Sequence, residues 1–207
     1  MMRYMVRSFA LLLALGASVS AADTTQYFFG FLKSAPTRVE LPKEEAAKLQ
    51  AAHIGHLEAM NERGGLVCAG PLANGGPLRG VVIYKTATQA EALTNASADP
   101  AVKRGQLAAE LFEWTGPAGI GDEYKRRAKE GAPVKMVKYH LLITKPGATF
   151  PGKGSVASGP YRDGGDAGQI LIFPELSAEE RKKLEGQQVK VLLDWYVADG
   201  VLPAARQ

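Results

Sequence analysis

The sequence predicts an α+β fold in which two ferredoxin-like β-α-β-β-α-β units pack as an intramolecular barrel. Three observations lead to this prediction: apolar residues alternate between strand and helix periodicity, one segment occurs twice at a fixed spacing, and two helix-start signals share that spacing. The composition agrees, because 46% hydrophobic and 22% charged residues are typical of a folded globular chain. One cysteine and three histidines exclude a disulfide scaffold and a cysteine-rich zinc fold.

The N-terminus has the parts of a secretory signal peptide. A basic start with Arg3 and Arg7 precedes an uncharged apolar run, and small residues lie before the expected cleavage position. We expect cleavage after Ala21, with Ala22 as the alternative, so that residues 1–21 are removed. The apolar run is shorter than the roughly 20 residues of a membrane-spanning helix, and no other stretch is as apolar. The mature chain is therefore expected in a bacterial periplasm or outside the cell, exported by a Sec-type signal, with no membrane span.

The charge of the chain offers little support for a nucleic-acid partner. The formal net charge is +4, and removal of the two leader arginines leaves +2. The remaining basic residues alternate with acids, for example between Glu123 and Glu130, which is typical of a solvated helix face. We therefore predict a small-molecule ligand or substrate and no nucleic acid.

The first unit, residues 22–118, contains its elements in ferredoxin-like order. An aromatic-rich strand over residues 26–33 precedes a long helix over residues 42–63, which ends at a pair of glycines. The elements expected next are strands over 66–71 and 79–85, a helix from 88 to about 96, and a strand from about 107 to 115.

Part of this unit recurs later in the chain. Residues 69–84 align without a gap with residues 158–173, an offset of 89, and Gly70-Pro71 aligns with Gly159-Pro160. At the same offset each copy has a hydroxyl residue followed three positions later by glutamate, the spacing of a helix capping box: Thr88 with Glu91, and Ser177 with Glu180. Two such signals at one offset indicate a tandem repeat.

The second unit, residues 134–207, is expected to be a degenerate copy without the first helix. The interval before its Gly-Pro is shorter by about the length of that helix and its loops. Residues 119–133 are interpreted as a linker with a short helix over 122–129. Strands are expected over 134–144, 155–160, 169–173 and 189–197, with a helix over 178–185.

The two predicted sheets each have one apolar face that the helices leave uncovered, and such faces commonly pack together into a barrel. We therefore expect a monomer with an internal pseudo-dimer, or a higher homo-oligomer built from it.

The long helix carries two of the three histidines. His53 lies at helical spacing with apolar residues that must face the sheet, namely Ala46, Leu49, Leu57 and Met60. From this pattern alone, a satisfied structural histidine is the more common outcome. His56 is three residues further on and could share a metal with His53, but no zincin pattern accompanies the pair, and we predict no metal.

Asp99 is expected to end the second helix, because a residue before proline is driven out of the helical conformation. A carboxylate at a helix C-terminus faces the negative end of the helix dipole and requires a nearby cation or donor. A protonated histidine would supply one. The alternative is a solvent-exposed aspartate that only ends the helix.

These residues together resemble the YCII-related (YciI-like) domain family. The spacing from His53 to Ala69-Gly70-Pro71, and the later Asp99-Pro100, are similar to the family pattern over roughly residues 26–114. The resemblance implies a dimeric α+β barrel fold, which also occurs in tandem, and catalytic use of His53 and Asp99. Some relatives are similar to small-molecule lyases and isomerases that act on aromatic degradation products.

In that interpretation His53 transfers protons near neutral pH, and Asp99 orients the ring and stabilises its protonated form. Gly70, Pro71 and His56 are the candidate substrate-binding residues. No nucleophile elbow, phosphate-binding loop or dinucleotide fingerprint is present, so no cofactor is expected. The second unit lacks the helix histidine and the Asp-Pro, so we expect one site per chain, on the first unit and walled on one side by the second.

Two functions remain open from the sequence. The first is an exported small-molecule enzyme of the lyase, isomerase or hydrolase type, with a substrate such as an aromatic or carboxylated molecule. The second is a non-catalytic periplasmic ligand-binding or scaffold protein with the same barrel. A separation above about 7 Å between the side chains of His53 and Asp99 would exclude a working pair.

Overall fold

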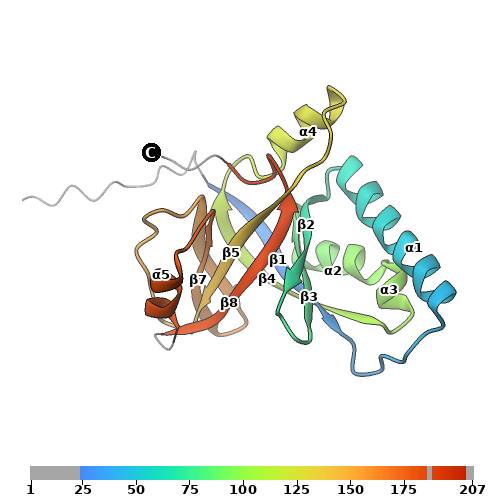
Figure 1. Cartoon of the computed structure of the whole chain (residues 1–207), viewed down its shortest axis with the longest axis horizontal. Helices are drawn as coiled ribbons and strands as arrows, with labels where there is room; N and C mark the ends of the chain where they lie inside the picture. The colour runs from blue at the N-terminus through green and yellow to red at the C-terminus, as the bar shows by residue number, and fades with distance from the viewer. Residues whose placement is uncertain (1–23, 186–187, 204–207) are drawn as a thin grey trace, which may run out of the picture.

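A computed structural model describes residues 24–185 and 188–203, and the expected signal peptide lies outside these residues (Figure 1). The strands are β1 (Thr24–Ser34), β2 (Leu66–Ala73), β3 (Leu78–Tyr84), β4 (Leu107–Pro117), β5 (Met136–Thr144), β6 (Ala157–Asp163), β7 (Asp166–Phe173) and β8 (Val189–Ala198). The helices are α1 (Lys43–Glu62), α2 (Gln89–Ser97), α3 (Pro100–Lys103), α4 (Asp122–Lys129) and α5 (Ala178–Leu184). All elements expected within this range are present, and α3 is an additional short helix.

The strands form one closed antiparallel barrel in the order β1-β3-β2-β8-β5-β7-β6-β4. Within each half of the chain the order is fourth, first, third, second: β4-β1-β3-β2 and β8-β5-β7-β6. The halves join where Leu72 of β2 pairs with Trp195 of β8, and where Trp114 of β4 pairs with Tyr161 of β6. The predicted α+β class and barrel are therefore confirmed.

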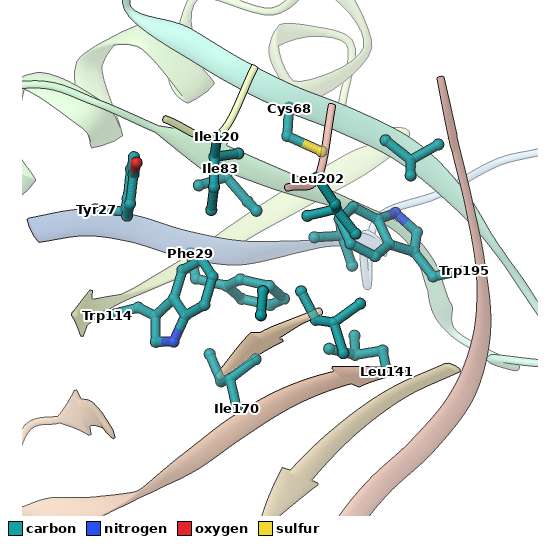
Figure 2. Packing of buried hydrophobic residues seen from close by; sticks show 14 of the residues in the cluster. Tyr27, Phe29, Cys68, Ile83, Trp114, Ile120, Leu141, Ile170, Trp195 and Leu202 are labelled. Carbon is teal, nitrogen blue, oxygen red and sulfur yellow. The ribbon is translucent and has the colours of Figure 1, made fainter. Parts of the chain in front are cut away.

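The barrel interior is filled by side chains from all eight strands (Figure 2). Alternate residues of a strand point to opposite faces, so one set of each strand enters this core and the other set faces outward. Aromatic rings dominate the core, and Phe29 stacks on Phe112 with ring centroids 5.5 Å apart. Trp114 and Trp195 are fully buried there. The core is thus packed with side chains.

Helices cover the outward faces on two opposite sides of the barrel (Figure 1). On the first half, α1 and α2 pack on the sheet through Met60 and Ala92 against residues such as Phe28 and Val82. On the second half, α5 covers a smaller apolar layer around Leu142. No helix lies between β5 and β6, so the second half has no helix in the position that α1 has in the first.

The helix starts follow the predicted capping pattern, with one difference. Ser177 forms a complete capping box with Glu180. The Thr88 hydroxyl accepts from the Glu91 backbone N–H, but the Glu91 carboxylate accepts from the N–H of Ala87 instead of the cap residue. The hydroxyl contact fixes the start of α2, which carries the chain toward Asp99.

No helix in the described part of the chain combines the length and the apolar character needed to cross a bilayer.

Candidate active site

Helix α1 packs closely on the barrel only through its C-terminal half. Of its residues, only His53 and Met60 are buried. The expected apolar stripe is thus partly wrong: Ala46 and Leu49 do not pack on the sheet but line a cavity beneath the helix. Helix α1 contacts α3 as well as β2, and near its start Glu45 forms an ion pair with Arg104, directly after α3.

His53 and Asp99 are in direct contact. The Nδ1 atom of His53 lies 2.7 Å from Oδ2 of Asp99, and both residues are buried, with 9% and 2% of their surface exposed. The distance is well inside the limit of about 7 Å set from the sequence, so the two side chains are close enough to act together. The two residues are 46 positions apart, and only the packing of α1 beside α2 and α3 joins them.

The environment of Asp99 differs from the expectation. Asp99 follows α2 but is the N-cap of α3, and its Oδ1 accepts from the N–H of Ala101 at 2.8 Å. The carboxylate therefore faces the donor end of a helical turn, not only the carbonyl end of α2. Pro100 explains this, because proline is favoured in the first turn of a helix as well as excluded from the interior. Both carboxylate oxygens are satisfied, which fixes the acid that orients the ring.

This geometry determines the protonation pattern of His53. An ionised carboxylate can only accept, so Nδ1 carries the hydrogen that it donates to Asp99. No other described residue forms a hydrogen bond with the ring, which leaves Nε2 without a protein partner. His53 lines the cavity, so Nε2 is the ring atom available for exchange of a proton with a ligand.

Tyr84 lies close to the pair at the end of β3 and is almost completely buried. Burial, and after it the negative charge of Asp99, raises the pKa of the Tyr84 phenol well above its ordinary value. The phenol therefore stays protonated and adds no second negative charge beside Asp99.

The cavity between α1 and the outer face of the barrel has a volume of about 520 Å³. Helix α1 forms its roof with Leu49, His53 and Leu57, and β2 and β3 form its floor with Ala69, Gly70 and Val82. Its size and mainly apolar lining with few polar groups are typical of small-molecule sites. The arrangement can hold a small ligand against an oriented histidine.

Residues 28–115 match the family model of the YCII-related domain. The chain carries a YCII-related domain. The match runs from β1 to β4 and includes both members of the His53–Asp99 pair. No curated protein and no solved structure matches the chain. The family resemblance read from the sequence is thereby confirmed for the first half.

Within the YCII-related domain, the three expected substrate-binding residues have different positions. Gly70 and Pro71 line the cavity. A side chain at Gly70 would also overlap with the carbonyl oxygen of Tyr196, so this glycine permits the close approach of β2 and β8. His56 does not line the cavity; its Nε2 donates to the carbonyl oxygen of Asn95 at 3.1 Å and ties α1 to α2.

The cavity of the YCII-related domain also contains polar residues that the sequence did not single out. Arg38, Arg79 and Gln106 line it, and Met136 is the lining residue from the second half, so the expected wall from that half is small. None of the three polar residues belongs to a motif, and they are far apart in the chain. Only the pairing of β1 with β3 and β4 brings them together, so no local signal could have found them.

The second half contains a His–Asp pair that the sequence analysis did not predict. Nδ1 of His140 on β5 lies 2.9 Å from Oδ1 of Asp194 on β8, and Nη1 of Arg181 on α5 lies 2.6 Å from the same oxygen. Burial of Asp194 favours its neutral form, but the hydrogen bond and charge of Arg181 outweigh this and lower its pKa. Arg181 is thus the main partner of this carboxylate.

Two other chemistries find little support in the described residues. No group of three or more His, Cys, Asp or Glu side chains is close enough there to hold a metal ion. Cys68 is buried in the barrel core, and burial raises the pKa of its thiol well above the ordinary value. A thiol in that state is a poor nucleophile.

Proposed function

We propose that the protein is an exported small-molecule enzyme of the YciI-like kind, in which His53 is the general acid–base residue and Asp99 positions it. The observation that carries the proposal is the 2.7 Å contact between Nδ1 of His53 and Asp99 beside a cavity of about 520 Å³. Buried histidines often serve only structure, but this one leaves Nε2 unpartnered at a cavity of ligand size.

The mechanism follows from the two ring nitrogens. Nε2 of His53 accepts a proton from an acidic C–H or O–H of the bound molecule, and the positive charge that forms on the ring is stabilised by Asp99 through Nδ1–H. Return of the proton to another atom completes an isomerisation, and return with departure of a leaving group completes a lyase reaction. For hydrolysis, Nε2 takes a proton from a bound water whose oxygen attacks a carbonyl carbon of the ligand, the bond from that carbon to the leaving oxygen breaks, and the ring returns the proton to this oxygen.

The internal symmetry of the barrel supports the proposal that the two halves are ferredoxin-like repeats. Residues 22–118 and 134–207 would be the units, joined by residues 119–133. At the offset of 89 found in the sequence, Leu72 corresponds to Tyr161, and these residues pair with Trp195 and Trp114 at the two junctions. The strand order is also the same in both halves.

Export is proposed on the N-terminal sequence alone. Sequencing the N-terminus of the protein from the periplasm or medium tests it, and the expected first residue is Ala22 or the residue after it. An intact N-terminus on protein in the cytoplasm would contradict export.

Proton abstraction can be tested before the substrate is known. We would incubate the protein with a panel of lactones, enols and halogenated phenols in D₂O and follow turnover and deuterium incorporation by NMR. We expect His53→Gln to reduce the rate of any active compound by at least about 100-fold, the lower range for loss of a general base.

The matched control is Glu58→Gln, an exposed change on the same helix, which should leave the rate unchanged. Activity that survives His53→Gln would contradict the mechanism. Saturable binding without turnover or exchange would favour the alternative, a non-catalytic ligand-binding protein.

A further inference from the structure

We propose that the cavity takes a small organic carboxylate with an apolar body, whose carboxylate is bound by Arg38 and Arg79 and whose acceptor atom is bound by Gln106. The inference rests on the proposed function for the site's location, since it assigns the substrate class of that same site.

The first argument is the charge of the cavity. Its lining contains two arginines, His53 and two glutamines, and no aspartate or glutamate. Glu40 lines only a smaller adjoining recess, together with Arg38. Neither Arg38 nor Arg79 takes part in an ion pair within the described residues, whereas four of the other six described arginines do: Arg104, Arg126, Arg127 and Arg181. Both arginines are exposed residues that line the cavity, so they bring to its solvent-facing side two positive charges without an acidic partner among the described residues, and a negatively charged ligand would neutralise them.

The second argument is the position of these groups. Lys33, near the end of β1, pairs with Leu78 at the start of β3, and Ser34 pairs with Leu107 at the start of β4. Arg38 follows β1, Arg79 lies next to Leu78, and Gln106 directly precedes Leu107. All three residues therefore lie at the same end of the first sheet, where β1 ends and β3 and β4 begin. Arginine has the forked donor geometry that suits a carboxylate.

The third argument is an unpartnered donor. Gln106 is 5% exposed, and its Nε2 has no hydrogen-bond partner. Its backbone is fixed at both ends, because its N–H donates to Ala101 and its carbonyl oxygen accepts from Ala35. A buried amide without a partner is unfavourable, and an acceptor atom on a ligand would satisfy it. The backbone of Gln106 is thus fixed beside the cavity that this residue lines, and its side-chain Nε2 is buried there.

The apolar part of the cavity lining indicates the chemical character of the ligand's body. Apart from the two arginines, His53 and the two glutamines, the cavity lining is apolar and includes Leu32, Leu49 and Val82. A ligand that places its carboxylate at the arginines and its reacting atom at His53, almost three turns into α1, therefore contacts mainly apolar side chains. Its body is therefore an aliphatic or aromatic hydrocarbon group.

The test is equilibrium binding by calorimetry on the full mature chain at fixed ionic strength. The probes are 4-phenylbutyrate and octanoate, the neutral amide of each, and inorganic phosphate. We expect each acid to bind at least about tenfold more tightly than its amide, which corresponds to about 1.4 kcal/mol. Phosphate should bind more weakly than either acid.

Substitutions identify the groups responsible. Arg38→Gln and Arg79→Gln should each weaken binding of the acids by fivefold or more and leave binding of the amides unchanged. Gln106→Leu should weaken both acids and amides. The control is Arg162→Gln, an exposed arginine of β6 outside the cavity, which should change nothing.

Several outcomes would overturn the inference: no binding of either acid at millimolar concentration, equal binding of acids and amides, or acid binding unaffected by both arginine substitutions. Phosphate binding as tight as that of the acids would indicate a general anion site instead. His53→Gln separates the two proposals, because acid binding should persist in this variant. Arginine-dependent binding without His53-dependent turnover would reject the proposed enzyme and retain the carboxylate site. His53-dependent turnover of neutral compounds only would retain the enzyme and reject the carboxylate site.

Discussion

The two halves of the barrel each contain a buried histidine hydrogen-bonded to an aspartate, in the layer between strands and helices. In the first half, the second partner of Asp99 is a backbone N–H, and the ring borders a cavity. In the second half, the second partner of Asp194 is the guanidinium of Arg181 on the covering helix. The two pairs differ in their surroundings: the charge of Asp194 is compensated by Arg181, whereas the second partner of Asp99 is a neutral N–H and its histidine lines a cavity. Under the proposed function, only the arrangement around Asp99 serves proton transfer.

The two halves also differ in their helices. In the first half, α1 stands off the sheet at its start and encloses a cavity. In the second half, no helix replaces it, and the shorter α5 brings Arg181 directly onto the pair. Under the proposed function, only the pair beside α1 and its cavity is catalytic, and the pair beneath α5 is structural.

The largest expected effect on kcat comes from replacing one carboxylate oxygen of the aspartate in each His–Asp pair by an amide nitrogen. Asp99→Asn should lower kcat on any substrate found in the panel by at least about 100-fold, because the amide no longer stabilises the imidazolium. Asp194→Asn should leave kcat unchanged. Steady-state kinetics of both variants measure this, and equal losses of kcat would remove the functional distinction between the halves.

Substitution of the glycines at the two junctions between the halves should lower stability equally, whereas substitutions in the two His–Asp pairs should differ in their effects. A methyl group at Gly70 would overlap with the carbonyl of Tyr196, and one at Gly159 with that of Thr115. Gly70→Ala and Gly159→Ala should each lower the free energy of unfolding by about 2–3 kcal/mol. Urea denaturation measures the loss. A neutral result at either junction would show that the barrel can separate there without penalty.

Removal of the Arg181–Asp194 ion pair should lower the stability of the protein and leave catalysis unchanged. Arg181→Met leaves Asp194 and His140 without their cation, and we expect a loss of about 1–2 kcal/mol at pH 7, since the pair is partly exposed. Because Arg181 lowers the pKa of Asp194 in the folded state, its contribution is present above the ordinary carboxyl pKa near 4 and is lost as the pH falls below it. The difference in unfolding free energy between wild type and variant should therefore shrink between about pH 5 and pH 2. A constant difference would contradict a charge-based role.

The smallest effect is expected on α1, where Gly55 has no atom within 4 Å of an added methyl group. Gly55→Ala should raise the free energy of unfolding by about 0.5–1 kcal/mol through helix propensity. The rate of proton transfer should not change, because the helix keeps its position. A loss of activity would show that the cavity requires local flexibility in α1.

Local sequence patterns predicted most of the secondary structure. Examples are the alternating strands, the capping hydroxyls of Thr88 and Ser177, and the glycines after α1. Each of these signals depends only on residues close together in the sequence. The constant offset of 89 also indicated related halves, because a repeat is visible without knowledge of contacts. The resemblance to the YCII-related domain supplied His53 and Asp99 as a pair, which spacing alone left open.

The sequence by itself therefore determined the elements, the α+β class and the two residues of the pair. Tertiary structure decided their surroundings: Asp99 caps α3, His56 binds Asn95 instead of a ligand, and His140 finds Asp194 under Arg181. It also placed Arg38, Arg79 and Gln106 at one edge of the cavity. The physical reason is that helices and caps depend on residues within about four positions, whereas a cavity and its charge depend on side chains that only sheet pairing and barrel closure bring together.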